Sequence, residues 1–562
     1  MRKLLLLFGV MAILTSCRND DDENLAGQSA PKIVLDNETG VYTVKSGREV
    51  TISPSYEHTD GALFVWSIDG KIVGRDTYLT YQAGQTGEVF VLLSVSNRNE
   101  TAEEELRIDV VDKEIPYISL AGAESGYKIL IGKELAFAPT VPQTSIPTSY
   151  RWTVNDKEVS TEKDYTFQSQ EKGIFNLKFT TENEDGSDFI EFTVQNCSAD
   201  ELPFSWAFDR TTFNMSIGRS IRLMPLDITN AIDVTYTWTM AGQEAPLQEG
   251  NDPVLIFTPT QQSTYKLTVT AKSEYIGEVS QEITVTACPA EGTYYRAATA
   301  ASQASSSKVY EIIAAPGQFV EQITTGTTME AACAAAETAF GNNAYISLGG
   351  FGGYVVVGFD HSIDNKGNYD FAVRGNSFSN SSEPGIVWVM QDENGDGKPN
   401  DTWYELKGSE YGKPETIQDY AVTYYRPKST GTPISWTDNQ GKKGSVDLNP
   451  KYPSWISADS YTLRGSCLQA RNEDTSGSGT YWVNRDYDWG YVDNYSKIDM
   501  ITGDGNNYFR ISDAVTYEGK PANLQYIDFI KVQVGVNAQS GWLGEISTEV
   551  LGFTDYNLTK NK

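Results

Sequence analysis

The chain has 562 residues and a formal net charge of −31, from 75 Asp and Glu against 44 Lys and Arg. It is too long for a single domain, and three to five domains are expected. An acidic surface repels phosphate backbones, which argues against nucleic acid as a partner. The 32 Tyr and 11 Trp residues exclude a disordered chain, and the only histidines, His58 and His361, are too few for a histidine-rich zinc site.

The first 30 residues carry targeting signals. An apolar run, Leu4–Leu14, follows two basic residues and is too short to cross a bilayer as a helix. It ends in Leu-Thr-Ser-Cys, which resembles a bacterial lipobox and implies a signal peptide over 1–16 and lipidation of Cys17. The acidic run Asp20–Glu23 resembles the export signal of Bacteroidetes surface lipoproteins, although a merely solvated tether is the alternative. We therefore expect 17–30 to be a tether that anchors the protein by lipid to the extracellular face of the outer membrane.

A repeat with an even period follows the tether. The segment Gly-Arg-Glu-Val-Thr-Ile-Ser-Pro begins at Gly47 and returns in related form at Gly132 and Gly218, with spacings of 85 and 86 residues. A tryptophan recurs in each repeat, 86 residues apart both times. These tryptophans are Trp66, Trp152 and Trp238.

Each repeat has the length and alternation of a seven-stranded β-sandwich. Alternation places the tryptophan on the same face as neighbouring apolar residues, so we interpret it as core rather than as a sugar-binding platform. The repeats resemble the PKD-like, immunoglobulin-type sandwiches of bacterial surface proteins. Short connectors between them favour a stiff spacer. The predicted sandwiches are 31–112, 115–196 and 203–287.

Residues 290–562 form a different unit. Strand patterns between Gly- and Asp-rich turns predict a mostly β domain, a larger jelly-roll-like sandwich. One short helix is predicted over 329–340, which is rich in Ala and stops at Gly341. Outside the cytoplasm disulfides are permitted, and the four cysteines after Cys17 leave three pairings or four free thiols open. These cysteines are Cys197, Cys288, Cys333 and Cys467.

An acidic loop follows a predicted strand in this domain. Asp392, Asn394 and Asp396 place side-chain oxygens at every second position, and Gly395 and Gly397 allow a sharp turn. Hard cations such as Ca²⁺ prefer such oxygen ligands. The loop is not an EF-hand, because its twelfth position is a Trp and strands flank it. We predict calcium as a cofactor, with a solvated acidic turn as the alternative. The predicted ligands are the side chains of Asp392, Asn394, Asp396, Asn400 and Asp401 and the carbonyl of Lys398.

Two long predicted loops, 428–460 and 471–497, are rich in aromatic residues. Rings in polar loops on a rigid sheet form a binding surface by default. The alternative is that several of them, Trp489 above all, plug the ends of the sandwich. We predict that at least two contact a ligand, because so many exposed rings would otherwise be a hydrophobic liability. The candidate ligand-binding residues are Trp436, Trp455, Trp482, Arg485, Tyr487, Trp489, Tyr491 and Trp542.

Five long motifs of this domain, at 354–363, 383–412, 487–496, 526–537 and 541–550, resemble one family. They are similar to the C-terminal domain of Bacteroidetes cell surface lipoproteins that occur beside cobalamin transporters. The resemblance implies capture of cobalamin (vitamin B12) or another corrinoid, as a bound ligand, for delivery to a TonB-dependent outer-membrane transporter. We expect all recognition to reside in this domain, with the sandwiches as spacers.

Two other functions stay open. Calcium and Trp platforms on an Ig-like spacer also suit a surface glycan-binding protein, since sugar CH faces stack on rings and carboxylates accept hydrogen bonds from hydroxyls. A glycosidase would need two carboxylates about 5–10 Å apart in one cleft. Acidic residues are too common to nominate such a pair, and no nucleophile motif occurs. No catalytic residue is therefore predicted, and the chain is not expected to be an enzyme.

Overall fold

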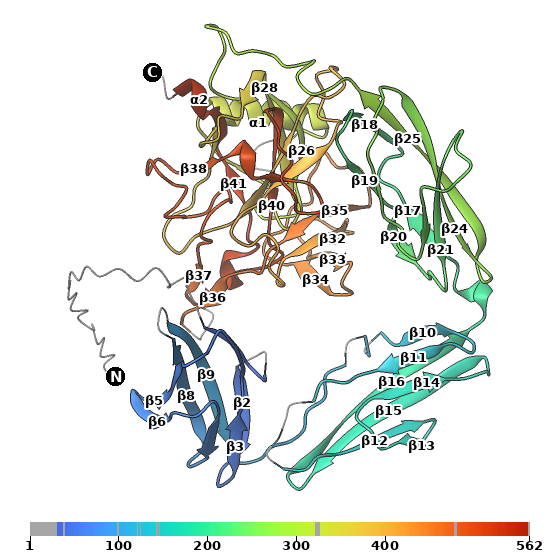
Figure 1. The fold of residues 1–562 in the computed structure, drawn as a ribbon, viewed down its shortest axis with the longest axis vertical. Coiled ribbons are helices and arrows are strands. Elements are labelled where there is room, and N and C mark those ends of the chain that lie inside the picture. Colours follow the sequence, from blue (N-terminus) through green and yellow to red (C-terminus); the bar gives the residue numbers. More distant parts are fainter. Residues whose placement is uncertain are drawn as a thin grey trace. The chain divides into compact units, whose positions relative to one another are not determined.

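A computed structural model gives the fold, in which the chain divides into two units, Met1–Leu202 and Pro203–Lys562, each described here by itself (Figure 1). The predicted signal peptide, the lipidated Cys17 and the tether lie outside the described residues. Within the described part, no helix combines the length and the apolar character needed to cross a bilayer. The described residues are 31–37, 40–97, 101–120, 122–123, 125–141, 144, 146–320, 326–476 and 480–559.

Three β-sandwiches come first in the chain and share one topology. In each, a five-stranded sheet packs on smaller strand pairs, and the first strand of the sheet runs parallel to the last strand of the module. The repeated tryptophan is fully buried in all three, and its indole N–H donates to a backbone carbonyl of the same module. The predictions of three sandwiches and of a tryptophan core are therefore confirmed.

In each sandwich five strands pair side by side in one sheet, and the remaining strands form separate pairs. The first sandwich contains β2 (Val41–Lys45), β9 (Thr101–Val111), β8 (Gly87–Ser96), β5 (Leu63–Ile68) and β6 (Lys71–Gly74), with the pairs β3 (Glu49–Ile52)–β7 (Leu79–Gln82) and β1 (Lys32–Val34)–β4 (Ser55–Glu57). The second contains β10 (Tyr127–Leu130), β16 (Gly186–Cys197), β15 (Gly173–Asn183), β12 (Ser149–Val154) and β13 (Lys157–Ser160), with the pair β11 (Glu134–Phe137)–β14 (Tyr165–Gln168). The third contains β18 (Thr212–Ser216), β25 (Gly277–Cys288), β24 (Thr264–Ser273), β21 (Thr235–Met240) and β22 (Gln248–Gly250), with the pairs β19 (Ile221–Leu223)–β23 (Leu255–Phe257) and β17 (Ser205–Ala207)–β20 (Leu226–Thr229).

The C-terminal domain is built on a six-stranded sheet. Alternation along its strands turns one set of side chains, such as Val387 and Val389, into the main core. Its other face carries Trp388 and Lys531 and is turned away from that core. The sheet contains, in order of pairing, β26 (Lys308–Ile313), β28 (Tyr354–Asp364), β40 (Tyr526–Val534), β30 (Gly385–Met390), β31 (Trp403–Leu406) and β39 (Ala514–Val515).

Smaller sheets and few helices complete this domain. Helix α1 (Met329–Gly341) packs Ala332, Cys333 and Ala336 into the main core, and the Thr328 hydroxyl caps its first turn by accepting from the Ala331 N–H at 3.2 Å. The remaining elements are β38 (Asn506–Phe509)–β29 (Phe371–Arg374)–β42 (Gly552–Asp555), β34 (Lys443–Val446)–β33 (Ile434–Asp438)–β32 (Ile417–Tyr425)–β35 (Ser460–Cys467), β27 (Ile346–Ser347)–β41 (Glu549–Val550), β36 (Asn472–Asp474)–β37 (Trp482–Asn484) and α2 (Tyr556–Thr559).

The four cysteines of the described region are all free and buried. Burial raises the pKa of the Cys288 and Cys333 thiols to about 11 and that of Cys467 to about 12. Of the alternatives that the sequence left open, the structure therefore shows four unpaired thiols.

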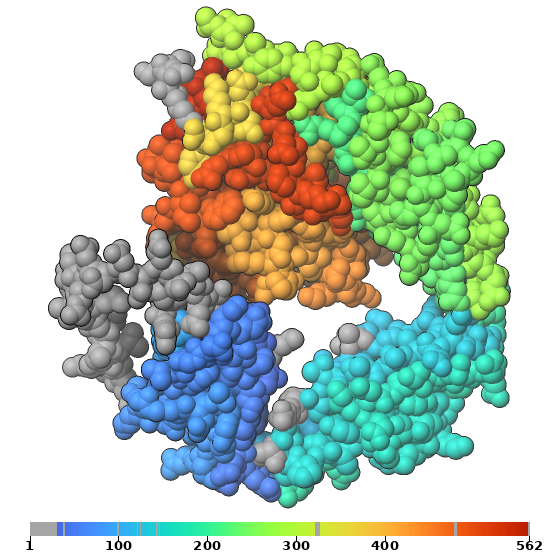
Figure 2. All heavy atoms as spheres, viewed as in Figure 1, coloured from blue at the N-terminus to red at the C-terminus, as the bar shows by residue number. Residues whose placement is uncertain are grey.

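The third sandwich packs directly against the C-terminal domain, as the green and the yellow-to-red parts of Figure 2 show. The Arg219 guanidinium forms an ion pair of 2.8 Å with Glu291 and donates to the Ala522 carbonyl, also at 2.8 Å. Asp227 accepts from Arg464 at 2.6 Å. A pure spacer would make no such contacts, so the spacer interpretation is incomplete for this sandwich.

Candidate functional site

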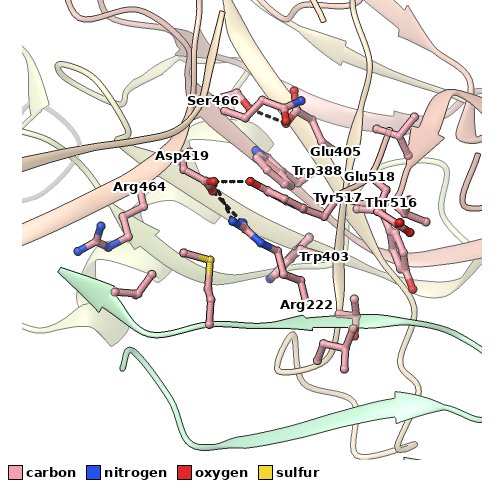
Figure 3. A pocket seen from close by; sticks show the side chains of 18 of the residues that line it. Arg222, Trp388, Trp403, Glu405, Asp419, Arg464, Ser466, Thr516, Tyr517 and Glu518 are labelled. Carbon is pink, nitrogen blue, oxygen red and sulfur yellow. Dashed lines mark hydrogen bonds and ion pairs between the residues drawn. The ribbon is translucent and has the colours of Figure 1, made fainter. Parts of the chain in front are cut away.

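A cleft of about 640 Å³ lies where the third sandwich meets the C-terminal domain (Figure 3). Residues of β18, β19, β20 and β23 supply one wall. The outward face of the six-stranded sheet supplies the other, together with residues of β32 and β35. Its volume falls within the range usual for small-molecule sites. The third sandwich and the C-terminal domain therefore line this cleft together.

Aromatic rings cover the sheet side of the cleft because side chains of paired residues on neighbouring strands point away from the main core there. Trp388 pairs with Lys531 on one side and with Glu405 on the other. The Lys531 ammonium nitrogen lies 4.7 Å from the Trp388 ring centre and 5.1 Å from that of Trp403. Such cation–π contacts hold the two indoles in place along the wall.

Two titratable groups of this wall have shifted pKa values. Burial lowers the pKa of Lys531 to about 8, against the attraction of Glu311 and Glu405. Burial likewise raises the pKa of Glu405 to about 7, although a hydrogen bond of 2.6 Å from the Ser466 hydroxyl opposes the rise. Near neutral pH Lys531 therefore stays mostly protonated and Glu405 is only partly ionised, so this wall combines a positive charge with two indole faces.

A bidentate ion pair joins the two sides of the cleft, in addition to the Arg464–Asp227 pair. Arg222 of β19 donates two hydrogen bonds of 3.0 Å each to the Asp419 carboxylate, and its guanidinium stacks 3.2 Å from the ring centre of Tyr517. The Tyr517 hydroxyl donates to the same carboxylate, as Figure 3 shows. Burial acts to raise the pKa of Asp419, but the bonds from Arg222 and Tyr517 outweigh it and hold the pKa below its ordinary value. A bidentate pair of this kind fixes orientation as well as distance.

The lining of the cleft is balanced in charge. Its basic side chains are Arg210, Arg222, Arg464 and Lys531, and its acidic ones are Asp227, Glu405, Asp419 and Glu518. Four charges of each sign argue against a site for phosphate or another polyanion. The amides of Gln418 and Asn439 and the hydroxyls of Ser466 and Thr516 also line the cleft and offer neutral hydrogen-bonding groups.

Three of the sequence-predicted aromatic residues lie in the interior. The Trp455 ring is buried and its N–H donates to the Ile312 carbonyl at 2.8 Å. Tyr487 and Tyr491 are 2% exposed and pack edge to face with ring centres 5.5 Å apart. A buried ring presents no face to a ligand, so these three residues correspond to the plug alternative.

The other predicted residues lie at or near the surface, away from the residues that line the cleft. Trp489 is half-buried and lines a smaller cavity of about 200 Å³ beside Tyr369. Trp436 is half-buried against a separate core cluster that contains Tyr420 and Tyr424. Arg485 is exposed and pairs with Glu473 at 2.8 Å.

Two of the predicted tryptophans, Trp482 and Trp542, neighbour each other beside the exposed Tyr481. The side chain of Trp542 is 60% exposed and that of Tyr481 is 62% exposed. The Trp542 N–H donates to the Thr480 carbonyl at 3.1 Å, and the Trp482 indole lies against Gly541. We name Tyr481, Trp482 and Trp542 the ring surface.

The predicted calcium loop folds tightly around its first aspartate. Asp392 is 5% exposed and accepts from the N–H groups of Gly395 at 2.9 Å and Gly397 at 3.0 Å. Both glycines have positive φ, +74° and +70°, which explains why glycine stands there. Asn400 bonds Asp396 at 2.9 Å and Asn394 at 3.3 Å. Four of the predicted side-chain ligands, Asp392, Asn394, Asp396 and Asn400, are therefore held in one turn, whereas Asp401 accepts from the Glu393 N–H instead.

A second acidic group was not predicted. Carboxylate oxygens of Glu383, Asp493 and Glu549 lie within 4.8 Å of one another in the interior. Burial raises the pKa of all three, and for Asp493 and Glu549 the Glu383 charge adds to the rise. Charges this close cannot all ionise, so the group shares protons at neutral pH. The three positions are far apart in the sequence and carry no common motif that could have revealed them.

Comparison with known proteins bears on the sandwiches. A model of the PKD-like domain family matches residues 30–97 and 115–183, which lie in the first two sandwiches. No curated protein shows significant similarity to the chain. Together with the fold, the match shows tandem PKD/Ig-like sandwiches followed by a larger β-sheet domain with few helices.

Several solved structures show local likeness. Fibronectin(III)-like modules of Clostridium thermocellum CbhA are 10% identical, with a TM-score of 0.16, and the match covers 30% of this chain and 96% of theirs. The three N-terminal domains of the bacteriophage RB49 highly immunogenic outer capsid protein are 13% identical, with a TM-score of 0.15 and coverage of 46% and 98%. Extracellular domains of Drosophila OTK are 10% identical, with a TM-score of 0.18 and coverage of 45% and 97%. At these TM-scores the likenesses support no inference about function.

Proposed function

We propose that this chain captures a neutral, ring-bearing small molecule in the cleft between its third sandwich and its C-terminal domain, and that the ligand is cobalamin or another corrinoid. The observation that carries the proposal is the cleft itself, about 640 Å³ in volume, with two indoles on one wall and four basic and four acidic side chains in its lining. Aromatic walls supply apolar contact area, and a balanced lining favours a ligand without net charge.

The chemistry of a corrinoid matches this lining. Cobalamin is neutral overall, presents broad apolar faces and carries amides around its rim. Trp388 and Trp403 offer rings for the faces, while Gln418 and Asn439 offer partners for the amides. A whole corrinoid is larger than the cleft, so we propose that one edge of the macrocycle enters and the remainder stays in solvent.

The cellular setting of this proposal follows from the sequence resemblances. Lipidated at Cys17, the protein would stand on the extracellular face of the outer membrane and pass its ligand to a TonB-dependent transporter. In this proposal the chain binds and transfers its ligand without chemical change, so it is not an enzyme.

The test uses the colour of cobalamin. The full ectodomain is mixed with cyanocobalamin at micromolar concentration and passed over a gel-filtration column, and visible absorbance should co-elute with the protein. Ile256→Arg places a long charged side chain in the cleft, and Trp403→Leu removes one wall, so each should weaken binding by at least about tenfold.

The matched control is Ile174→Arg. Ile174 is also an exposed isoleucine on a strand, 65% exposed in the second sandwich, and it lines no part of the cleft. Ile174→Arg should bind like the unmodified chain. Absence of co-elution, or equal binding by all variants, would remove the cleft as the corrinoid site.

A second candidate function is glycan binding at the ring surface. Tyr481 and Trp542 are both more than half exposed, and neighbouring exposed rings suit the CH faces of sugars. Polysaccharide retardation in native gels tests this candidate. Retardation that Trp542→Ala abolishes, with cobalamin binding intact, would assign sugar binding to the ring surface.

A further inference from the structure

The acidic loop 392–401 lies between the third sandwich and the cleft. Glu393 accepts from the Ser216 N–H of β18 at 3.1 Å. Arg210 donates to the carbonyl of Asn400 at 2.8 Å and to that of Asp401 at 3.3 Å. The loop thus contacts the sandwich from both of its ends.

The same loop leads directly into the cleft wall. Thr402 and Trp403, which follow Asp401, both line the cleft, as does Arg210 from the sandwich. The Thr402 hydroxyl contacts the Asn214 carbonyl of β18 at 3.5 Å. Any change in the loop is therefore transmitted to the wall and to the docked sandwich through one or two residues.

Two buried carboxylates of the loop, those of Glu393 and Asp401, each have one oxygen without a hydrogen-bond partner. Asp401 is fully buried, and while one of its oxygens accepts from the Glu393 N–H at 2.9 Å, the other has no hydrogen-bond partner. A buried, unsatisfied carboxylate oxygen beside other carboxylates is costly unless a cation or a proton neutralises it.

We propose that the loop binds one Ca²⁺ ion and that the bound ion fastens the third sandwich to the C-terminal domain. Hydrogen bonds within the loop hold the side-chain oxygens of Asp392, Asn394, Asp396 and Asn400 in one turn, and Asp401 and the Lys398 carbonyl belong to the same loop. All-oxygen sets with several carboxylates suit Ca²⁺. The ion would draw the carboxylates together and hold Asn400 and Asp401 where their carbonyls meet Arg210.

The consequence for ligand capture rests on the proposed function of the cleft. With the loop closed on Ca²⁺, Trp403 and Arg210 are held in the positions that form the cleft, so a corrinoid should bind more tightly in calcium than in its absence. Calcium binding and sandwich docking themselves involve no organic ligand and are tested without one.

Calorimetric titration of the metal-stripped ectodomain with CaCl₂ tests the site. One ion per chain is expected, and Asp396→Ala, which removes a surface carboxylate of the loop, should weaken calcium binding by at least about tenfold. The matched control is Asp504→Ala. Asp504, like Asp396, accepts from the backbone N–H two residues on, at 3.1 Å, but it lies outside the loop 392–401.

Hydrogen exchange of residues 212–216 tests the fastening. Calcium should slow the exchange of this strand by at least about tenfold in the unmodified chain and in Asp504→Ala, and leave it unchanged in Asp396→Ala. No calcium uptake, or equal affinity in both variants, overturns the site. Uptake without slower exchange overturns the fastening. Neither readout depends on whether the cleft binds cobalamin, so the two proposals fail separately.

Discussion

The ammonium nitrogen of Lys531 lies 4.7 Å from the centre of the Trp388 ring, and the two residues are register partners on β40 and β30. Burial lowers the pKa of this lysine to about 8, so its charge changes within an accessible pH range. The electrostatic environment of the Trp388 indole therefore changes when Lys531 loses its proton.

Tryptophan emission should report that titration. Because a cation over an indole perturbs its fluorescence, emission is expected to change with a midpoint near pH 8 in the unmodified chain and to lose that change in Lys531→Met. Lys308→Met is the control, since Lys308 lies 4.4 Å from a tyrosine ring, that of Tyr310. A transition that persists in Lys531→Met would assign it to another group.

Glu405 should make stability depend on pH. Its pKa rises from 4.5 to about 7 on folding, so the folded state binds an extra proton, and the stabilising contribution is fully present below pH 4.5 and lost as pH rises through 7. The urea midpoint of Glu405→Gln should therefore vary less between pH 5 and 8 than that of the unmodified chain. Across that range the free energy of unfolding of the unmodified chain should fall by on the order of 2 kcal/mol relative to the variant. Glu415→Gln, at an exposed position, should keep the slope of the unmodified chain.

The Arg222–Asp419 pair should contribute measurably to docking of the third sandwich. A double-mutant cycle with Arg222→Ala and Asp419→Ala, followed by urea unfolding, should give a coupling of about 1–2 kcal/mol, because the pair is bidentate and Arg222 is 15% exposed, although Asp419 is 50% exposed. The comparison pair is Lys266 and Glu282, at 3.1 Å but more than half exposed on both sides, with an expected coupling below about 1 kcal/mol. Equal couplings would mean that the pair adds nothing beyond a surface contact.

Trp152 should be essential to the second sandwich. Its ring is fully buried and lies 4.5 Å from Phe179 and 5.7 Å from Phe137 between ring centres. Trp152→Ala should lower the free energy of unfolding by about 3–5 kcal/mol, and Trp152→Phe by clearly less. Denaturant unfolding followed by circular dichroism measures both losses. A small loss in Trp152→Ala would contradict an essential contribution of this ring to the core.

The sandwiches were predictable because their signal is local and repeated. Alternation around Trp66, Trp152 and Trp238 identifies a buried face within a few residues, and the period of about 85 residues gives the module length. Helix α1 was predicted to within one residue of its C-terminal end, because Ala content and a terminal Gly act locally.

The cleft could not be predicted, because it depends on contacts between distant segments. Arg222 and Asp419 are separated by 197 positions, and neither stands in a distinctive motif. For the same reason, the sequence could not show which aromatic residues of the loops are buried. Tyr487 and Tyr491 have the composition of a binding loop, but the chain folds back so that both rings fill a core with Leu468 and Ile546. Nothing in the loop sequence distinguishes them from the exposed Tyr481.

In every sandwich, the parallel pairing of the first strand of the five-stranded sheet with the last strand of the module has a mechanical consequence. Residues Thr212–Ser216 of β18 run alongside Thr284–Cys288 of β25, and the same pairing recurs as β2 with β9 and β10 with β16. A pull on the two ends of such a module loads this ladder along its length, so its bonds must shear together instead of opening one after another. The architecture is thus suited to a chain held at one end and dragged by flow or by a bound load at the other.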